Sequence, residues 1–126
     1  MIPSYGGVIL TYQDMVLLCK RSKHLKRFPE YWAIPAGYIE SGESPKDCAI
    51  RELEEETQIK IKDASLVAVI DTPTGNFCVY HKSIEDKVNP VLDFEHTEFD
   101  YLTSDNLPEP MDPELQQVIY DVLKNK

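Results

Sequence analysis

The stretch from residue 37 to residue 59 places three glutamates where a single helix would bring them together. Glu52, Glu55 and Glu56 are spaced i, i+3 and i+4, so on a helix they lie within an arc of about 100°. Like charges this close repel one another, and a helix selected for stability alone avoids them. A hard divalent cation such as Mg²⁺ reverses that cost, because it binds carboxylate oxygens together with water and substrate phosphates. The spacing therefore predicts a helix face that binds a metal ion.

The residues before the glutamates predict where this helix begins. Ser44 can cap its N-terminus, Pro45 suits the first helical position, and Asp47 completes a pair that resembles a capping box. We expect a helix from about Pro45 to Thr57. Its buried side is expected to contain Ala49, Ile50 and Leu53.

The wider stretch resembles the signature of the Nudix (MutT-like) hydrolase family, G-x5-E-x7-R-E-U-x-E-E-x-G-U, in which U is apolar. Gly37, Glu43 and Arg51 stand in register with the three glutamates, and the match covers 23 of the 126 residues. The chain departs from the signature at Gln58, where the family has a glycine. A glycine there would end the helix with a positive φ, which costs other residues roughly 1–2 kcal/mol. The departure therefore bears on the turn after the helix and removes no carboxylate.

The resemblance implies an α/β fold. It is the Nudix-type α/β/α sandwich, with a mixed β-sheet, a catalytic loop–helix–loop and a C-terminal helix, in a single domain over residues 1–126. It also implies an enzyme, a pyrophosphatase acting on phosphoanhydride bonds. Such an enzyme hydrolyses the diphosphate linkage of a nucleoside diphosphate attached to another moiety, with Mg²⁺ as cofactor and Mn²⁺ as the alternative. The residues suit this chemistry, because cleaving a P–O–P bond requires charge neutralisation and a deprotonated water.

The same resemblance assigns roles within the motif. Glu52, Glu55 and Glu56 are expected to bind the metal, and the backbone carbonyl before the first glycine, at Ala36, is expected to join them. Glu52 is also the first choice for the group that orients or deprotonates the attacking water. Arg51 is expected to hold the glutamates by charge-assisted hydrogen bonds. The alternative interpretation of the three glutamates is a solvated acidic helix face.

A second acidic stretch, residues 94–102, follows the last expected loop. In Nudix proteins a glutamate from this region often adds a metal ligand or a general base, and both Glu95 and Glu98 fit that description here. The sequence does not choose between them. Glu98 is taken as the additional metal ligand, either residue rivals Glu52 as the base, and a solvated loop is the alternative.

One basic stretch, residues 20–27, stands out in an acidic chain. It holds five Lys or Arg residues and one His within eight positions. Arg21, at the end of an expected strand, is the best candidate for contacting substrate phosphates, and Gly37 is the second predicted substrate-binding position. A solvated loop is again the alternative interpretation.

Charge and composition disfavour several classes of protein. The net charge of −9 argues against nucleic-acid and anionic-membrane partners, which are bound through cationic surface. No apolar run approaches the ~20 residues of a membrane span, and the N-terminus lacks a signal pattern, so we expect a cytoplasmic protein. The cysteines are odd in number and far apart, so we expect three reduced and mostly buried thiols: Cys19, Cys48 and Cys78.

The rest of the chain alternates strand and turn patterns before a closing helix. The segment 65–70 is β-branched and apolar, which predicts a buried strand. Residues 59–61 are expected to start a further short strand. Pro113 should begin the last helix, whose apolar stripe packs on the core. Other strands are expected over 5–12 and 15–20, as a hairpin, and over 77–84 and 99–102.

Three classes of function remain. They are a metal-dependent diphosphohydrolase, a Nudix-fold module that binds or senses a nucleotide without turnover, and a nucleic-acid-binding protein that uses the basic stretch. The complete carboxylate set favours the first, and the negative net charge argues against the third. The sequence selects neither the substrate nor the oligomeric state, for which a homodimer is one alternative. Aromatic side chains that could stack a base are Tyr5, Tyr12, Phe28, Tyr31, Phe77 and Tyr80.

Overall fold

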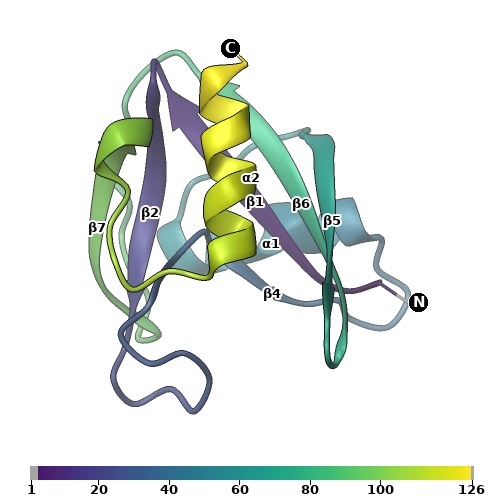
Figure 1. Ribbon diagram of the computed structural model, residues 1–126. Coiled ribbons are helices and arrows are strands. Elements are labelled where there is room, and N and C mark those ends of the chain that lie inside the picture. The colour runs from purple at the N-terminus through teal and green to yellow at the C-terminus, as the bar shows by residue number, and fades with distance from the viewer. Residues whose placement is uncertain (1–2, 126) are drawn as a thin grey trace.

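The computed structural model describes residues 3–125, which form a β-sheet between two α-helices (Figure 1). This is the α/β/α sandwich that the sequence predicts. No helix in this part of the chain is long and apolar enough to cross a membrane. The strands are β1 (Pro3–Tyr12), β2 (Met15–Arg21), β3 (Trp32–Ala33), β4 (Ala36–Tyr38), β5 (Ser65–Thr72), β6 (Gly75–Ile84) and β7 (His96–Thr103), and the helices are α1 (Pro45–Thr57), the short 3-10 helix η1 (Ser104–Asn106) and α2 (Pro113–Lys124).

The sheet is built around β1. This strand pairs antiparallel with β2 and β4 and parallel with β6, so the sheet is mixed. The strand order is β3-β2-β1-β6-β5, and β7 pairs with β2. Val8, Ile9 and Leu10 of β1 are fully buried, as expected for a strand that is covered on both faces. The predicted hairpin at the start of the chain is confirmed as β1 and β2.

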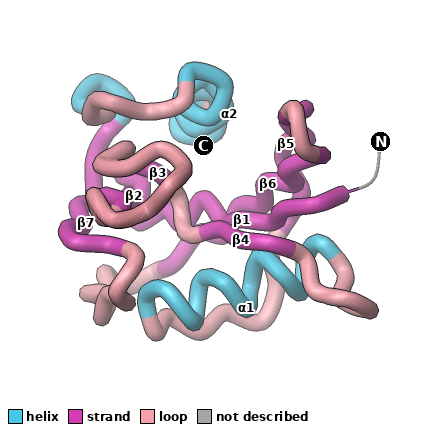
Figure 2. The backbone as a smooth tube through the Cα atoms, turned by 90° about the horizontal axis from the view of Figure 1, so that it is seen from below, coloured by secondary structure: helices cyan, strands magenta, loops and turns pink. Residues whose placement is uncertain are grey.

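The two helices cover opposite faces of the sheet (Figure 2). Successive side chains of a strand point to opposite faces, and β1 follows this rule. Val8 and Leu10 belong to a core cluster with Leu53 of α1, whereas Ile9 belongs to a second cluster with Ile119 of α2. The core therefore has two layers, and the predicted apolar stripe of the last helix is confirmed.

α1 spans the predicted range, and its caps explain both ends. The side chain of Ser44 accepts a hydrogen bond from the backbone N–H of Asp47 at 3.0 Å. At the other end, Gln58 has a left-handed backbone with a φ of 61°, and its N–H donates to the carbonyl of Glu54 at 2.8 Å. The positive-φ turn expected at this position is therefore formed by a glutamine.

α1 lies close to β1 at Gly6. A Cβ atom at this residue would be 2.7 Å from the carbonyl oxygen of Pro45 and 3.1 Å from the backbone nitrogen of Ala49. Both are backbone atoms, so a side chain here would push the helix off the strand. Glycine at this position sets the spacing between the acidic helix and the sheet.

β5 is a strand as predicted, but the prediction that it is buried is wrong. Leu66, Val67 and Val69 are between 41% and 56% exposed, and Ile70 is buried. β5 is the edge strand of the sheet and is hydrogen-bonded to β6 on one side. Burial of a strand depends on its place in the sheet, which its own residues do not encode.

The short strand predicted over residues 59–61 is also wrong. These residues leave α1 as a loop in which Ile59 is buried and Ile61 packs against the core cluster under α1. The end of the helix is joined to a later loop, because the carbonyl of Thr57 accepts a hydrogen bond from the N–H of Val91 at 2.9 Å. The apolar character of this segment reflects packing against the core and not pairing in the sheet.

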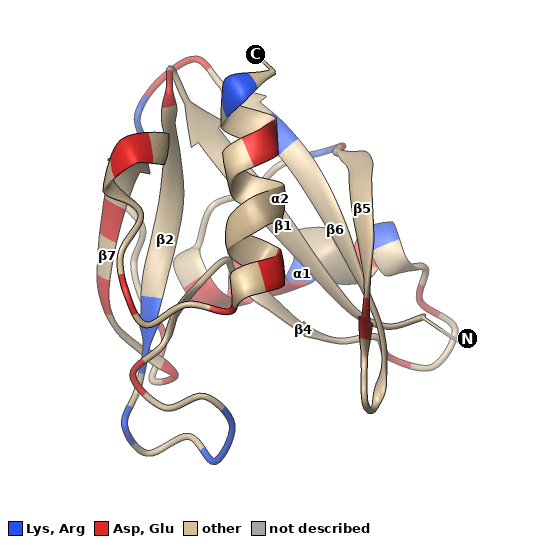
Figure 3. Ribbon diagram, viewed as in Figure 1, with Lys and Arg blue, Asp and Glu red and all other residues tan. Residues whose placement is uncertain are grey.

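The basic stretch forms most of a loop, residues 22–31, that extends from the sandwich between β2 and β3 (Figure 1). Figure 3 shows Lys and Arg positions along the ribbon of this loop, whereas Asp and Glu positions lie on β7 and α2 in that view. Two backbone hydrogen bonds close its base. The N–H of Arg21 donates to the carbonyl of Tyr31 at 2.8 Å, and that of Glu30 donates to the carbonyl of Arg21 at 3.1 Å.

Candidate active site

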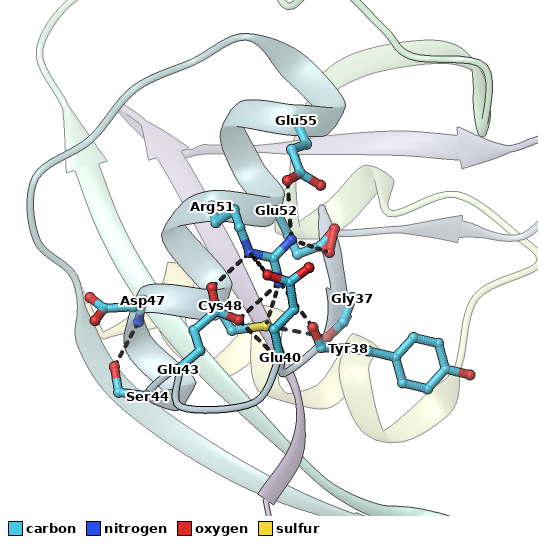
Figure 4. A network of polar contacts seen from close by, with 10 residues as sticks. All are labelled: Gly37, Tyr38, Glu40, Glu43, Ser44, Asp47, Cys48, Arg51, Glu52 and Glu55. Atoms are coloured by element: carbon cyan, nitrogen blue, oxygen red, sulfur yellow. Dashed lines mark hydrogen bonds and ion pairs between the residues drawn. The ribbon is translucent and has the colours of Figure 1, made fainter.

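Arg51 of α1 joins the acidic helix to the segment that precedes it (Figure 4). Its Nε and Nη2 atoms donate to the two carboxylate oxygens of Glu43 at 2.7 and 2.9 Å, and Nη2 also donates to the carbonyl of Tyr38 at 3.0 Å. Paired charge-assisted hydrogen bonds of this kind fix geometry as well as adding energy. The hydrogen bonds from Arg51 lower the pKa of Glu43 to about 2, so this pair stays ionised.

The same guanidinium faces two of the helix glutamates. Its Nη1 atom lies 3.4 Å from an oxygen of Glu52 and 3.2 Å from an oxygen of Glu55. Glu55 is 56% exposed, whereas Glu52 is largely buried. The repulsion expected from the spacing of the glutamates is therefore offset by one arginine, and these contacts support the role predicted for Arg51.

Glu52 lies against the backbone of β4 at Gly37. A Cβ atom at residue 37 would overlap the Glu52 carboxylate. Burial raises the pKa of Glu52 above its usual range, and the positive charge of Arg51 opposes that shift. Gly37, predicted as a substrate-binding position, thus makes room for a carboxylate.

Glu56 is the most deeply buried of the three glutamates, with a side chain 3% exposed. Its Oε1 atom accepts a hydrogen bond from the N–H of Ala36 at 3.3 Å, and its Oε2 atom is buried without a hydrogen-bond partner within residues 3–125. Burial, followed by the charges of Glu52 and Asp93, raises the pKa of Glu56 to about 10. A buried acceptor without a partner is costly, and a bound cation would satisfy it.

Two residues that the sequence analysis missed stand beside Glu56. The Nε2 atom of His96 lies 3.5 Å from Oε1 of Glu56, and its Nδ1 atom lies 2.9 Å from an oxygen of Asp93. The backbone is tied to the helix as well, since the N–H of Asp93 donates to the carbonyl of Glu56 at 3.3 Å. The available signal was a lone histidine inside an acidic stretch that is otherwise expected to be solvated.

The structure separates the two glutamates that the sequence leaves open. The backbone carbonyl of Glu95 accepts a hydrogen bond from Ser22 at 2.7 Å, and its charge adds to burial and the nearer carboxylates in raising the pKa of Glu56. Glu98 lies on β7, and its Oε2 atom is 3.6 Å from Nζ of Lys20. Glu95 therefore acts electrostatically on Glu56 of the acidic helix, whereas Glu98 pairs with Lys20 of β2.

Arg21, predicted to contact substrate phosphates, is engaged with the basic loop. Its Nε and Nη2 atoms donate to the carbonyl of Arg27 at 3.1 and 2.9 Å. The loop turns back through Phe28 and Glu30, which have φ values of 49° and 62°. The side chain of Arg27 then reaches β1, where Nη1 donates to the hydroxyl of Tyr5 at 3.1 Å. Arg27, which the sequence analysis did not single out, is the arginine of this stretch that lies beside β1.

The donor set around α1 fits a hard divalent cation. Across residues 3–125, no three His, Cys, Asp or Glu side chains already surround one point as a finished metal site. Oxygens of Glu52 and Glu55 face Arg51, and Oε1 of Glu56 faces Ala36. All donors are nevertheless oxygens, the ligands that Mg²⁺ and Mn²⁺ prefer. The free lone pairs of Glu56 Oε2 add the acceptor that such an ion requires.

These features define a small α/β domain whose helix carries a braced, partly buried set of carboxylates. A family model described as the NUDIX domain matches residues 2–122. The chain therefore belongs to the Nudix family, and the resemblance seen in residues 37–59 is confirmed.

Solved structures share the fold. A NUDIX hydrolase from Nitrosomonas europaea superposes with a TM-score of 0.83 at 20% identity, over 100% of this chain and 73% of that one. The NUDIX domain of Shewanella oneidensis NrtR, in complex with ADP ribose, superposes with a TM-score of 0.79 at 18% identity, over 99% of this chain and 89% of that one. At these identities the likeness establishes the architecture of the domain.

Curated relatives match over shorter segments. The m7GpppN-mRNA hydrolase NUDT17 of Xenopus laevis is 44% identical over 62 residues, which are 47% of this chain and 21% of that protein. Nudix hydrolase 25 of Arabidopsis thaliana is 31% identical over 87 residues, 69% of this chain and 45% of that protein. The ADP-ribose pyrophosphatase of Methanocaldococcus jannaschii is 34% identical over 65 residues, 52% of this chain and 37% of that protein. The matches cover less than half the length of each relative.

Proposed function

We propose that this protein hydrolyses the diphosphate linkage of a nucleoside diphosphate attached to another moiety, with a divalent cation as cofactor. The observation that carries the proposal is the buried Oε2 of Glu56, which lacks a hydrogen-bond partner in the described part of the chain and lies on the same helix face as Glu52 and Glu55. A buried carboxylate oxygen without a partner is costly unless a cation binds it, and a bound cation also attracts phosphate oxygens.

Four oxygen donors of this chain would hold Mg²⁺ or Mn²⁺: the carboxylates of Glu52, Glu55 and Glu56 and the carbonyl of Ala36. When bound, the ion neutralises phosphate charge and lowers the pKa of a coordinated water. Glu52 would orient or deprotonate the attacking water, because burial gives it the raised pKa that suits a general base. Glu95 is the alternative base.

Two further groups position these carboxylates. Arg51, paired with Glu43, contacts Glu52 and Glu55 and limits the orientations of their carboxylates. His96 contacts Glu56 and restricts where its carboxylate can point. Partners of ligating groups tune affinity for the metal in the same way in other metal sites.

The names of the relatives support the substrate class. The Xenopus relative is named a hydrolase of m7GpppN-mRNA, and the Methanocaldococcus relative is named an ADP-ribose pyrophosphatase. The Shewanella domain is described in complex with ADP ribose. Each of these molecules contains a nucleoside diphosphate joined to a further group, and that shared chemistry is what we assign to this chain.

A second candidate is a module that binds such a molecule without turnover. The observation in its favour is that Arg51 faces the oxygens of Glu52 and Glu55, so these two side chains must turn before both can coordinate an ion. The two candidates differ in a single measurement, the metal-dependent release of product.

The test is a substrate panel assayed with Mg²⁺, with Mn²⁺ and with a chelator. The panel holds nucleoside triphosphates, ADP-ribose, dinucleoside polyphosphates and NADH, and products are separated by chromatography. We expect metal-dependent release of a nucleoside monophosphate from at least one substrate, lost in the Glu55→Gln/Glu56→Gln double variant. Metal-dependent binding without product from any substrate would establish the binding module instead.

We also propose that the protein is cytoplasmic, forms a homodimer and has no general affinity for nucleic acid. The cysteines Cys19, Cys48 and Cys78 are buried and unpaired, as in a reducing compartment. The exposed apolar side chains of the β5 edge offer a surface for a second copy. The net charge of −9 opposes nucleic-acid binding. Light scattering tests whether the protein is a dimer. The salt dependence of its affinity for oligonucleotides tests whether it binds nucleic acid.

A further inference from the structure

Two tyrosines form a tilted aromatic pair on the face of the sheet that points away from α1. Tyr5 of β1 and Tyr38 of β4 are directly opposite in the strand register, and their ring centroids are 5.0 Å apart at an angle of 48°. Their neighbours Gly6 and Gly37 face α1, so alternation along the strands directs both tyrosines to the other side. Figure 4 shows the Tyr38 ring pointing away from the Arg51 network.

Tyr38, the last residue of the short strand β4, has a largely exposed ring. Its side chain is among the large apolar groups that face solvent, at 63% exposure. Its backbone, in contrast, is fixed from both sides: β4 pairs with β1, and the Tyr38 carbonyl accepts a hydrogen bond from Arg51. A rigidly held aromatic ring that remains open to solvent has the properties of a stacking surface for a planar ligand.

Arg27 supplies a cation at the same place. Its guanidinium carbon lies 5.7 Å from the centroid of the Tyr5 ring, and Nη1 donates to the Tyr5 hydroxyl at 3.1 Å. Hydrogen bonds with the hydroxyls of Tyr5 and Tyr38 raise the pKa of Arg27, so it remains charged. Arg21 donates to the carbonyl of Arg27, which helps to hold its guanidinium over the Tyr5 ring.

The pair of rings lies next to the carboxylate site. Tyr38 follows Gly37, whose backbone contacts Glu52, and β4 begins at Ala36, whose N–H donates to Glu56. The carboxylates and the rings are therefore on opposite faces of one short strand. A ligand that passes the edge of β4 can place its phosphates at α1 and a planar group at Tyr38.

We propose that Tyr5, Tyr38 and Arg27 form the site that binds the nucleobase of the substrate. The base stacks on the exposed face of Tyr38, and the guanidinium of Arg27 closes the stack through cation–π and planar contacts. This proposal rests on the proposed function for its link to catalysis. Stacking accepts any base, so the site selects molecules that carry a nucleobase over those that do not.

The test compares binding of nucleoside monophosphates with binding of ribose 5-phosphate, which has the same phosphate and sugar but no base. Chemical-shift titration in a buffer containing Mg²⁺ gives the affinities for wild type, Tyr38→Ala, Tyr38→Phe and Arg27→Ala. Tyr120→Ala is the matched control, because Tyr120 is an exposed tyrosine on α2 with a cation, Lys124, 5.5 Å from its ring centroid. Thermal melting of each variant confirms that it is folded.

We expect wild type to bind at least one nucleoside monophosphate about tenfold more tightly than ribose 5-phosphate, the scale of a single aromatic–base stack. Tyr38→Ala and Arg27→Ala should lose that preference. Tyr38→Phe keeps the ring and should retain it, as should Tyr120→Ala. The affinity for ribose 5-phosphate should be the same in all five proteins.

Equal affinity of wild type for the two kinds of ligand, or an unchanged preference in Tyr38→Ala, overturns the proposal. Neither ligand contains a phosphoanhydride, so the result does not depend on hydrolysis. Absence of turnover in the substrate panel would reject the proposed function and leave this binding result standing. Turnover together with an unchanged base preference in Tyr38→Ala would reject the stacking site alone.

Discussion

The carboxylate of Glu52 occupies the space that a side chain at Gly37 would need. The two residues are fifteen positions apart in sequence and belong to different elements, yet each defines the place of the other. The glycine of β4 admits the carboxylate, and the carboxylate is held between the helix and the strand. The first glycine of the motif is thus required by a side chain of α1 and not by its own backbone conformation.

Gly37→Ala tests this relationship. The added methyl group would meet the mobile end of a glutamate side chain, so we expect Glu52 to rotate away while the fold persists. Turnover should fall by about a hundredfold, the usual effect of losing a positioned base, with a melting temperature within a few degrees of wild type.

Gly42→Ala is the control for that variant. Gly42 has a φ of +80°, and a Cβ atom added to it would have open space around it, with no heavy atom of residues 3–125 beyond its chain neighbours within 4 Å. The control should lose about 1 kcal/mol of stability because of its backbone conformation and keep its activity. Full activity in Gly37→Ala together with a loss in Gly42→Ala would refute the assignment.

Glu52→Gln tests the role of the carboxylate itself. The amide retains the size of the side chain and loses the charge and basicity, so we expect a normal fold and turnover lowered by about a hundredfold or more. Steady-state kinetics on the best substrate of the panel gives the result. A rate near that of wild type would assign the role of base to Glu95. Turnover should then be lost in Glu95→Gln.

Glu43 should make stability depend on pH in the acidic range. Hydrogen bonds from Arg51 hold the pKa of Glu43 at about 2 in the folded protein, below its ordinary value of 4.5. A lowered pKa means that ionised Glu43 stabilises the fold above pH 4.5 and that this contribution is lost as the pH falls toward 2. In urea titrations, Glu43→Gln should therefore be less stable than wild type at neutral pH, and the gap should close on acidification. Glu85→Gln, at an exposed loop position, should show no such gap, and a gap for Glu43→Gln that persists at low pH would contradict the prediction.

His96 should act on the metal requirement. It contacts Glu56 through Nε2, so its loss frees that carboxylate to adopt other orientations. We expect His96→Ala to raise the Mg²⁺ concentration for half-maximal activity by about tenfold or more, the usual effect of removing a partner of a ligating group. His96→Gln retains an N–H donor and should recover part of the loss. The exposed loop residue His24, changed to Ala, should leave the requirement unchanged.

Short-range sequence patterns correctly predicted the bounds of the acidic helix α1, but they wrongly predicted that the edge strand β5 is buried. Ser44 and Pro45 mark the start of α1 through short-range hydrogen bonding and geometry, which any chain with those residues shares. Leu66 and Val69 have the composition of a buried strand, but their exposure follows from the position of β5 in the strand order. That order is set by contacts between distant segments.

The same distinction separates the predicted from the missed site residues. The motif placed Glu52 and Arg51 because their spacing lies within one helix. The contact of Arg27 with Tyr5 depends on how a loop with two positive-φ residues folds back, which local patterns do not predict. Tyr38 lay inside the motif at a variable position, and its role becomes visible only when β4 pairs with β1. The role of His96 was also missed, because its partner Glu56 is forty positions away in the sequence.

The parallel pairing of β1 with β6 has a consequence for the order in which the protein folds. Gly6 pairs with Cys78, so the strand at the start of the chain gains this neighbour only after much of the remaining sequence is available. During synthesis, β1 and the helix packed on it must wait with their apolar faces incompletely covered until β6 leaves the ribosome. Contacts of such long range form slowly. We therefore expect refolding of the full chain to be limited by the pairing of β6 with β1 and not by formation of α1.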